Sequence, residues 1–369
     1  MKLTISKEQI NFGLQAVQNI VSTRSTLPIL SNVLLRADQN KLQIVATDLD
    51  VSISCLVAAN VQVPGAITLP AKKVAGIMRE LAALEIEMEV DEKNICTIQA
   101  GSSFYKMHGL PAEHFPAIPN PEGQRKIIIS QEKLKSLLRK TSFAISNDES
   151  RFVLNGIFFS LKDHKITLVA TDGRRLALAD EAVDLGNFEN ADFILPTKAI
   201  NEITRVLQTK GEAEISLSAN QATFSLKEEN GPLLVVISKL VEGAYPNYRQ
   251  VIPAECKERI PLPREEFLHA LRRAEIMTSD KATSVKLNFT KNNLAITANT
   301  PEVGEARESM AVNYKGPDMA VAFNPGFLME PLKAVETDEV YLELIDELSP
   351  GVLKINGPFL YVIMPMRMG

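Results

Sequence analysis

Three aspartates follow an Ala-Thr pair at residues 46–47 or its repeat at residues 170–171. Asp48 and Asp50 follow the first copy of this pair, and Asp172 follows the second. Carboxylates are preferred ligands of Mg²⁺, so the three side chains could form the metal site of a nuclease. Each aspartate, however, follows a stretch of alternating apolar residues, where acidic residues commonly form turns. We therefore favour turn residues, and the nuclease alternative requires all three carboxylates to converge in one pocket.

The histidines and cysteines show no second catalytic pattern. No histidine stands at a metal-ligand spacing or in a recognisable pairing with a nucleophile. The cysteines are odd in number and unpaired in spacing, which predicts reduced packing residues. The sequence contains neither GxxxxGK[ST] nor GxGxxG. We expect no catalytic residue, metal or cofactor. The residues concerned are His108, His114, His164 and His269, with Cys55, Cys96 and Cys256.

The elements that hold these residues recur three times. Each copy begins with an amphipathic helix, expected at residues 6–22, 130–146 and 263–279. Ser6 and Ser130 suit N-caps, and Pro263 suits a first helical turn. A strand with one buried face follows near residues 42–46, 166–170 and 294–298, and a second helix lies within 70–81, 196–210 and 324–336.

The intervals between copies are nearly constant. The second helix recurs after 126 and then 128 residues, and the turn after the strand recurs after 124 and then 128. Repeats of this length form small domains rather than solenoid turns of about 20–50 residues. Proline-rich stretches indicate two linkers. We predict an α+β protein with domains at 1–124, 125–254 and 255–369, each with two helices packed on antiparallel sheet.

Positive charge concentrates on the predicted helices. Their six windows contain 15 lysines and arginines against 9 acidic residues, although the chain has a net charge of −5. If the helices shared one face, that face would attract phosphates without reading bases. Lysine and arginine are also good helix formers on a solvated surface. Charge alone leaves both interpretations open.

Composition indicates an ordinary folded protein. Apolar residues make up 45% and charged residues 23% of the chain. No segment reaches the roughly 20 apolar residues that cross a bilayer, and the N-terminal residues lack a secretory signal. We expect a cytoplasmic protein.

Four segments resemble the beta subunit of bacterial DNA polymerase III, the beta sliding clamp family. They occur in order within a threefold repeat of the right length, so the resemblance covers essentially the whole chain. It implies a head-to-tail homodimer that forms a ring of six similar domains, with helices around the hole and sheet outside. The segments are Thr26–Leu30, Ala170–Ala177, Ser238–Gly243 with Tyr245–Tyr248, and Tyr361–Arg367.

The resemblance also implies a function and partners. Such a ring encircles double-stranded DNA without sequence preference and confers processivity on the polymerase without catalysis. The implied partners are a second copy of the chain, the replicative polymerase alpha subunit, the clamp loader, and other clamp-motif proteins such as translesion polymerases, ligase and mismatch-repair proteins. The implied location is the nucleoid.

A groove between the second and third domains is implied as the site for short hydrophobic peptides. Flexible methionines suit a pocket with several partners, and Arg175 and Arg367 are expected at its rim. Arg174 stands where relatives often have histidine, while Gln250 and Pro350 replace expected rim residues. The matching positions are Leu154, Thr171, Gly173, Arg174, Arg175, Leu176, Pro246, Val251, Asn324, Phe327, Leu348, Val362, Met364, Pro365, Met366 and Arg367.

Without the resemblance, the same segments have a simpler interpretation. Tyr361–Met366 would be a terminal core strand, and Thr171–Gly173 would be only a turn.

DNA-contacting and dimer positions follow in the same way. Arg24 and Lys72 match basic positions of the family, and we add Lys198 and Arg205 from their helices. Relatives often carry two aromatics where this chain has Phe152 and Val153, so stacking on bases is weaker here. The implied dimer interface sets Lys73, Tyr105 and Met107 against Ile276, Met277 and Glu302 of a second copy. Pairing there would cover an exposed edge strand, although Ile276 and Met277 equally suit the core.

Two alternatives to a clamp stay open. The nuclease needs carboxylates from two predicted domains in one pocket. A non-catalytic repeat scaffold that does not encircle DNA predicts no dependence on DNA ends.

Overall fold

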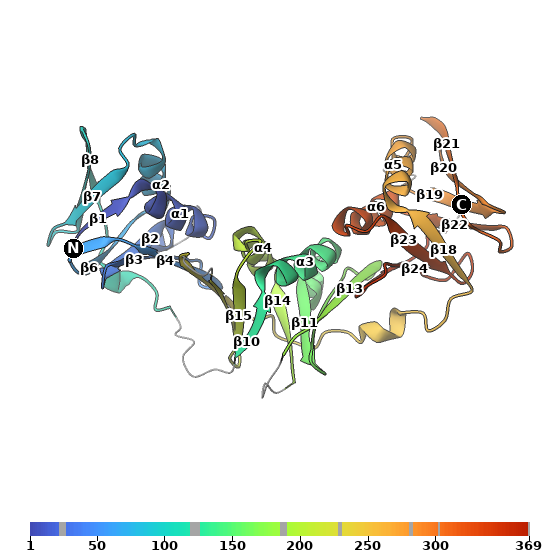
Figure 1. Cartoon of the computed structure of the whole chain (residues 1–369), viewed down its shortest axis with the longest axis horizontal. Coiled ribbons are helices and arrows are strands. Elements are labelled where there is room, and N and C mark those ends of the chain that lie inside the picture. Colours follow the sequence, from blue (N-terminus) through green and yellow to red (C-terminus); the bar gives the residue numbers. More distant parts are fainter. Residues whose placement is uncertain are drawn as a thin grey trace. The chain divides into compact units, whose positions relative to one another are not determined.

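The structure is a computed structural model that describes residues 1–21, 27–118, 126–184, 190–227, 231–279, 283–301 and 303–367 (Figure 1). The order of its elements confirms the predicted repeat. The first copy contains β1 (Lys2–Ser6), α1 (Lys7–Val17), β2 (Asn32–Asp38), β3 (Lys41–Thr47), β4 (Val51–Ala58), β5 (Asn60–Val63), β6 (Gly65–Pro70), α2 (Ala71–Glu80), β7 (Glu85–Val90), β8 (Ile95–Ala100) and β9 (Ser103–His108).

The second and third copies follow the same order, except that their described residues include no counterpart of β5. The second contains β10 (Lys126–Ser130), α3 (Gln131–Thr141), β11 (Gly156–Lys162), β12 (Lys165–Thr171), β13 (Arg175–Ala182), β14 (Ala191–Pro196), α4 (Thr197–Val206), β15 (Glu212–Leu217), β16 (Gln221–Lys227) and β17 (Leu233–Lys239). The third contains β18 (Glu258–Pro263), α5 (Arg264–Glu275), β19 (Val285–Thr290), β20 (Asn293–Thr300), β21 (Gly304–Ala311), β22 (Met319–Phe323), α6 (Pro325–Ala334), β23 (Glu339–Leu344), β24 (Gly351–Lys354) and β25 (Phe359–Ile363).

The helices begin as predicted, but the first helix of each copy ends earlier. Ser6 accepts a hydrogen bond from the backbone N–H of Gln9, and Ser130 accepts one from Lys133, so both act as N-caps. Pro263 occupies the N-cap position rather than the first turn. The hydroxyl of Thr141 donates to the carbonyl oxygen of Leu137 in the last turn of α3, and such local bonds compete with a further helical turn.

The predicted apolar stripes form the buried faces of these helices. In each copy, the two aligned residues four positions apart are at most 1% exposed. Burying a side chain of this size contributes roughly 1.5–3 kcal/mol. Helix α1 packs on α2, and α5 packs on α6 (Figure 1). The stripe residues are Ile10 and Leu14, Leu134 and Leu138, and Phe267 and Leu271.

The described strands form four sheets, and every described pairing is antiparallel. The orders are β5-β1-β7-β8-β9, β10-β15-β16-β17-β4-β3-β2-β6, β14-β11-β12-β13-β25-β24-β23-β18 and β21-β20-β19-β22. Each eight-stranded sheet therefore joins strands of two consecutive copies. The joining pairs are β4·β17 and β13·β25.

The contacts divide the chain into two compact units. Unit 1 contains the first copy with β10, β15, β16, β17 and most of α4, and unit 2 contains the rest of the second copy with the third. The division runs through the second copy because the sheets cross from one copy to the next. The predicted domain boundaries near residues 124 and 254 stay a prediction. No helix in the described parts is both long and apolar enough to span a membrane.

A glycine at the start of β11 tests the tight pairing of β11 with β14. A Cβ atom added at Gly156 would lie 2.2 Å from the carbonyl oxygen of Leu195, so the strands must shift. We expect Gly156→Ala to lower the free energy of unfolding by roughly 1–3 kcal/mol, measured by denaturant unfolding. The control is Gly76→Ala in α2, where an added Cβ would meet no atom within 4 Å outside the local helix backbone. A gain of about 0.5–1 kcal/mol in the free energy of unfolding is expected there. Equal stabilities would contradict this packing.

Candidate functional site

The turn between β12 and β13 is fixed by two side chains. The Thr171 hydroxyl accepts a hydrogen bond from the N–H of Gly173 (3.1 Å) and donates to the carbonyl oxygen of Arg175 (2.6 Å). One Asp172 carboxylate oxygen accepts from the N–H groups of Arg174 (2.9 Å) and Arg175 (3.1 Å). Gly173 has φ of 86°, a left-handed conformation that favours glycine. Asp172 is thus a turn residue.

The C-terminal segment lies beside this turn. Leu176 in β13 pairs with Val362 in β25. Beyond the strand, the N–H of Met364 donates to the carbonyl oxygen of Arg174 (2.9 Å), and that of Met366 donates to Ala322 (2.8 Å). The interpretation as a terminal core strand is confirmed for β25, whereas the residues that follow it reach the surface.

Apolar side chains form a buried floor beside exposed ones. Leu154, Leu176 and Val362 are at most 7% exposed, and the latter two pack with Tyr248. Met364 is 44% exposed, and Val251, at the end of the 3-10 helix η5 (Tyr248–Val251), is 47% exposed. Exposed apolar side chains next to a buried apolar cluster are typical of a surface that binds a partner.

Aromatic residues of the segment before η5 pack on the same sheet. Phe158 stacks on Tyr245 with 4.9 Å between ring centroids, and its ring lies 6.0 Å from that of Tyr248. Burial raises the pKa of Tyr245. Sequence reasoning selected only Pro246 from this segment. The Tyr-Pro-Asn-Tyr run was the signal for the two tyrosines, since aromatic residues that flank a turn often anchor it to a core.

Arg175 is not at the rim, in contrast to the prediction. Its side chain is 8% exposed, and its Nε bonds to Asp172 at 3.0 Å. One terminal nitrogen donates to the carbonyl oxygen of Phe143 (2.6 Å), and the other forms an ion pair with Glu330. The guanidinium carbon lies 4.2 Å from the centroid of the Phe327 ring, a cation–π distance. The arginine therefore joins the turn to α6. A buried guanidinium needs partners for its charge and its N–H groups, so this side chain does not lie exposed at the rim.

Phe327 is held at the start of α6 by two further bonds. Its N–H donates to the side-chain oxygen of Asn324 (3.2 Å), which is the N-cap. Its carbonyl oxygen accepts from the hydroxyl of Tyr361 (2.8 Å). Burial raises the pKa of Tyr361, so the phenol keeps its proton and remains a donor. These bonds and Arg175 bring Phe327 and Asn324 next to β13 and β25.

The remaining predicted groove residues lie at or near the surface of unit 2. Leu348 is 82% exposed in the loop between β23 and β24, where Asp346 accepts a hydrogen bond from its N–H (2.9 Å). The half-buried members are Thr171, Asn324, Phe327, Pro365 and Met366, and the other exposed members are Gly173, Arg174, Pro246 and Arg367.

The basic positions proposed for DNA contact differ in their surroundings. Lys72 on α2 is exposed, whereas Lys198 on α4 forms an ion pair with Asp48. Phe152, in the 3-10 helix η4 (Glu149–Leu154), is 58% exposed. Arg24 lies outside the described residues.

Arg205 is engaged within unit 1. Its terminal nitrogens donate to the carbonyl oxygens of Gln15 (3.1 Å) and Ala16 (2.5 Å) near the end of α1, and the guanidinium pairs with Glu202 (2.6 Å). Positive charge at a helix C-terminus is stabilising. A structural contact therefore accounts for this residue without DNA.

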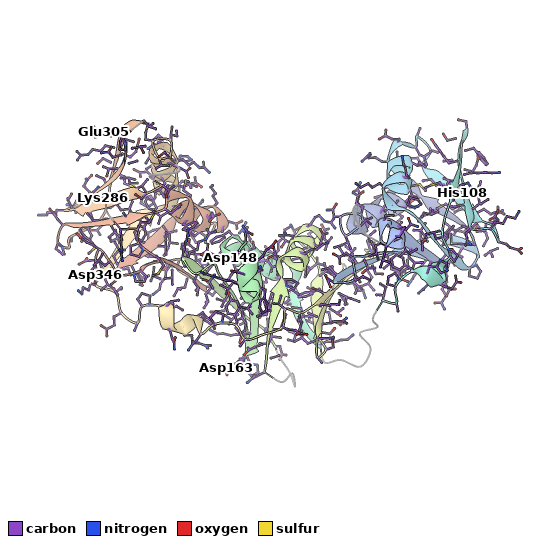
Figure 2. The ribbon with its side chains drawn as sticks, turned by 180° about the vertical axis from the view of Figure 1, so that it is seen from behind. His108, Asp148, Asp163, Lys286, Glu305 and Asp346 are labelled. Carbon is purple, nitrogen blue, oxygen red and sulfur yellow. The ribbon has the colours of Figure 1, made fainter. Side chains whose placement is uncertain are left out.

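Three of the predicted dimer residues, Tyr105, Met107 and Met277, lie on or beside two edge strands. β9 is an edge strand of unit 1 and β21 one of unit 2; His108 and Glu305 mark them in Figure 2. Tyr105 on β9 is 38% exposed, and Ile276 after α5 is 75% exposed. Met107 is half-buried on β9 and Lys73 exposed on α2. Met277 is half-buried next to Gly304, the first residue of β21. Glu302 lies outside the described residues.

Three family models match consecutive parts of the chain. The N-terminal domain of the DNA polymerase III beta subunit matches residues 1–119, its central domain 128–247 and its C-terminal domain 249–367. The chain belongs to the family of bacterial beta sliding clamps.

Individual beta sliding clamps match over the full length. The clamp of Chlamydia muridarum is 35% identical over 368 residues, which cover 100% of this chain and 99% of that protein. A crystal structure of the Pseudomonas aeruginosa subunit is 32% identical with a TM-score of 0.93. A crystal structure of the Bartonella birtlesii clamp bound to griselimycin is 34% identical with a TM-score of 0.91. Both structural matches cover 100% of each chain.

The acidic residues considered for a nuclease have local roles. An oxygen of Asp48 accepts from the N–H groups of Asp50 (3.0 Å) and Val51 (2.7 Å), as Asp172 does in its own turn. Asp48 and Asp50 belong to unit 1 and Asp172 to unit 2. Within the described ranges, no group of three or more His, Cys, Asp and Glu side chains is placed to hold a metal ion.

The cysteines differ from one another in burial. Cys55 and Cys96 are buried, and burial raises the pKa of each thiol to about 12. Cys256 is exposed, so the prediction of a packing role is wrong for this residue. It lies in the connection before β18, where no strand or helix covers the side chain.

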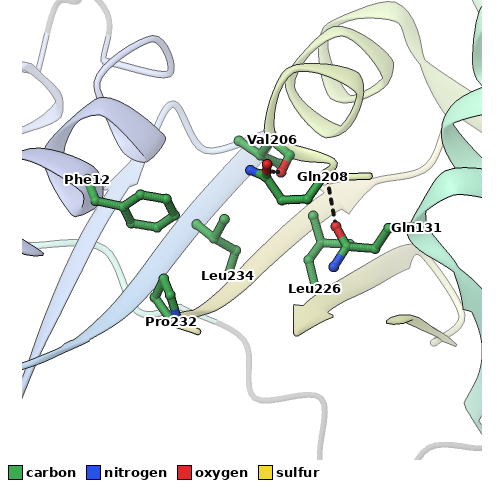
Figure 3. Close-up of a pocket in the computed structure, with 7 residues that line it drawn as sticks. All are labelled: Phe12, Gln131, Val206, Gln208, Leu226, Pro232 and Leu234. Carbon is green, nitrogen blue, oxygen red and sulfur yellow. Dashed lines mark hydrogen bonds between the residues drawn. The ribbon is translucent and has the colours of Figure 1, made fainter. Parts of the chain in front are cut away.

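A pocket of about 160 Å³ lies in unit 1, apart from all predicted residues (Figure 3). Its polar side chains already have partners. The Gln131 amide nitrogen donates to the carbonyl oxygens of Glu212 and Lys227, and its oxygen accepts from the N–H of Gln208. Satisfied amides next to Phe12 indicate a packing irregularity rather than a ligand site.

The contacts by which Arg175 joins the turn to α6 can be tested by substitution. Arg175→Met keeps most of the volume but removes the side-chain donor of the Phe143 carbonyl and of one Asp172 oxygen. We expect a loss of about 1–3 kcal/mol in the free energy of unfolding, measured by thermal and denaturant unfolding. Glu330 is 37% exposed, but the oxygen that faces Arg175 is buried, so the loss of this ion pair adds to the cost. The control Arg367→Met changes an exposed residue and should stay within about 0.5 kcal/mol. A loss of unfolding free energy no larger than the control's would refute this stabilising role of Arg175.

Proposed function

We propose that this chain is a DNA sliding clamp. Two copies join head to tail in a ring around duplex DNA and tether the replicative polymerase and other DNA-processing proteins, without catalysis by the ring itself. The observation that carries the proposal is the match of all three beta-subunit domains along the whole chain. The place of action is the nucleoid.

Open sheet edges support head-to-tail closure. In a single chain, β9 and β21 each have one neighbouring strand, and unpaired edges are prone to pair with another strand. Pairing β9 of one copy with β21 of the other satisfies both edges. It also covers exposed apolar side chains at Tyr105 and Ile276. Lys73, Met107, Met277 and Glu302 complete the proposed interface.

Weak contacts with the duplex suffice for such a ring. Retention comes from closure, so phosphate contacts need only keep the ring centred and mobile. Lys72 is the exposed candidate, and Arg24 and Phe152 are further positions. The Asp48 partner lowers the net charge at Lys198, and Arg205 contributes less because its guanidinium is engaged.

The groove of unit 2 is the proposed docking site for partner peptides. The buried apolar cluster of Leu176, Tyr248 and Val362, with the exposed Met364 and Val251 nearby in the chain, favours bulky apolar side chains, and methionine adapts to several partners. The expected partners are the polymerase alpha subunit, the clamp loader and other clamp-motif proteins such as translesion polymerases, ligase and mismatch-repair proteins.

Retention on DNA of different topology tests the ring. The chain is loaded by a related clamp loader with ATP onto nicked circular plasmid, and part of the sample is then linearised at moderately high salt. We expect stable retention on circles and rapid loss from linear DNA, because a ring slides off free ends. Equal release from both, with an active loader, would support the scaffold that does not encircle DNA.

The closure contacts can be tested without DNA. Ile276→Asp places a charge at the proposed interface, where water is excluded in the dimer. We expect the dimer to weaken at least about 100-fold, measured by analytical ultracentrifugation over a dilution series. The control Ile128→Asp changes a side chain that is 53% exposed on β10 and should leave dimerisation unchanged. Equal dimer affinities for both variants would argue against this interface.

A further inference from the structure

The turn that borders the groove has a copy in unit 1. The Thr47 hydroxyl accepts from the N–H of Leu49 (3.1 Å) and donates to the carbonyl oxygen of Val51 (3.2 Å). An Asp48 oxygen accepts from the N–H groups of Asp50 and Val51. These bonds match those of Thr171 and Asp172, 124 residues later. Leu49 also has a left-handed backbone, with φ of 79°.

The strand beside the turn is copied as well. Ser52 in β4 pairs with Ile237 in β17, as Leu176 pairs with Val362. The N–H of Lys239 then donates to the carbonyl oxygen of Asp50 at 2.9 Å. The bond from Met364 to Arg174 has the same length and position. The turn and the strand pairing beside it are therefore present twice in the chain, once in each unit.

The side chains of the two junctions differ in polarity. Where β13 carries Leu176 and Leu178, β4 carries Ser52 and Ser54. The Ser52 hydroxyl lies 2.8 Å from that of Thr47, and Ser54 accepts from the amide of Gln43 (3.0 Å). The copy thus has hydrogen-bonded hydroxyls on β4, next to the buried Ile237 of β17, where the other junction has apolar side chains on both strands.

Two ion pairs lie beside these hydroxyls. Lys239, at the position of Met364, pairs with Asp50 at 3.0 Å, where the groove has Arg174. Lys198, at the position of Gly326, pairs with Asp48. The charged side chains of the first pair are more than half exposed. Such pairs add little to stability, but an apolar peptide laid across them must strip water from the charges, which is unfavourable.

We propose that the β4·β17 junction is a closed second copy of the groove, and that Ser52 with the pairs Asp50–Lys239 and Asp48–Lys198 excludes apolar peptides from it. These residues determine specificity by limiting each chain to one peptide, so that a ring of two chains tethers two partners. The inference rests on the proposed function of the unit 2 groove.

Transfer of one ion pair into the groove provides the first test. Arg174→Asp with Met364→Lys reproduces Asp50 and Lys239 at exposed positions. The probe is a synthetic peptide of the alpha subunit's clamp-binding segment, and its affinity is measured by calorimetry on the full-length chain. We expect at least about ten-fold weaker binding. The control Ile128→Asp makes the same net change, one negative charge, at a remote exposed position and should leave affinity unchanged.

The reverse transfer provides the second test. Ser52→Leu, Asp50→Arg, Lys239→Met and Lys198→Ala are combined on a Met364→Glu background, which closes the original groove. We expect peptide binding to return at least about ten-fold above the background, with photo-crosslinks to residues 48–52. Absence of this gain in a variant with an unchanged melting temperature overturns the proposal. If the combined variant does not fold, the first test decides.

The controls separate this inference from the function of the groove itself. Unaltered chain that binds no peptide, or a Met364→Glu variant that binds normally, would refute the groove in unit 2. Unaltered chain that binds one peptide but crosslinks at the β4·β17 junction would leave the proposed clamp function standing and overturn the closed copy.

Discussion

Antiparallel pairing between strands of neighbouring copies is the interaction on which the structure depends. β4 pairs with β17, and β13 pairs with β25, so each copy satisfies the backbone groups of the next. A buried backbone group without a partner is costly, which makes these junctions continuous sheet rather than loose domain contacts. β9 and β21 are among the strands that remain at the edges of sheets. They carry the proposed head-to-tail association, in which each of the two gains a strand from another chain.

In the repeated junction, the residues that build the backbone turn differ from those that determine what the surface can bind. Thr47 and Asp48 in one unit, and Thr171 and Asp172 in the other, build the same turn with the same bonds. Such bonds involve backbone groups and a short side chain, so they place little restriction on the residues nearby. Those neighbours set the chemistry of each surface. Apolar residues at one junction form the floor of the proposed peptide groove, whereas hydroxyls and ion pairs at the other favour water.

Charge counted along the sequence overstates the charge that is available for DNA. Helical lysines and arginines outnumber acidic residues, but several have partners within the fold. Lys198 pairs with Asp48, the Arg205 guanidinium binds carbonyl groups of α1, and Lys135 donates to the carbonyl oxygen of Leu207. The sequence cannot reveal these partners because they are distant along the chain. A topological link makes the smaller charge sufficient, since binding strength does not have to hold the ring on DNA.

Local patterns determined the elements, and long-range contacts determined the site. Periodicity located the helices and the repeat, because the apolar residues of a buried helix face recur at a fixed spacing within each segment. Ile10 and Leu14 are an example. Whether Arg175 lies exposed at a rim or buried between the turn and α6 depends on Glu330 and Phe143, which no local pattern connects to it. The division into two units depends likewise on strand pairing between copies. Sequence alone determined the repeat and its turns, whereas tertiary structure decided which side chains meet, since pairing joins residues far apart in the chain.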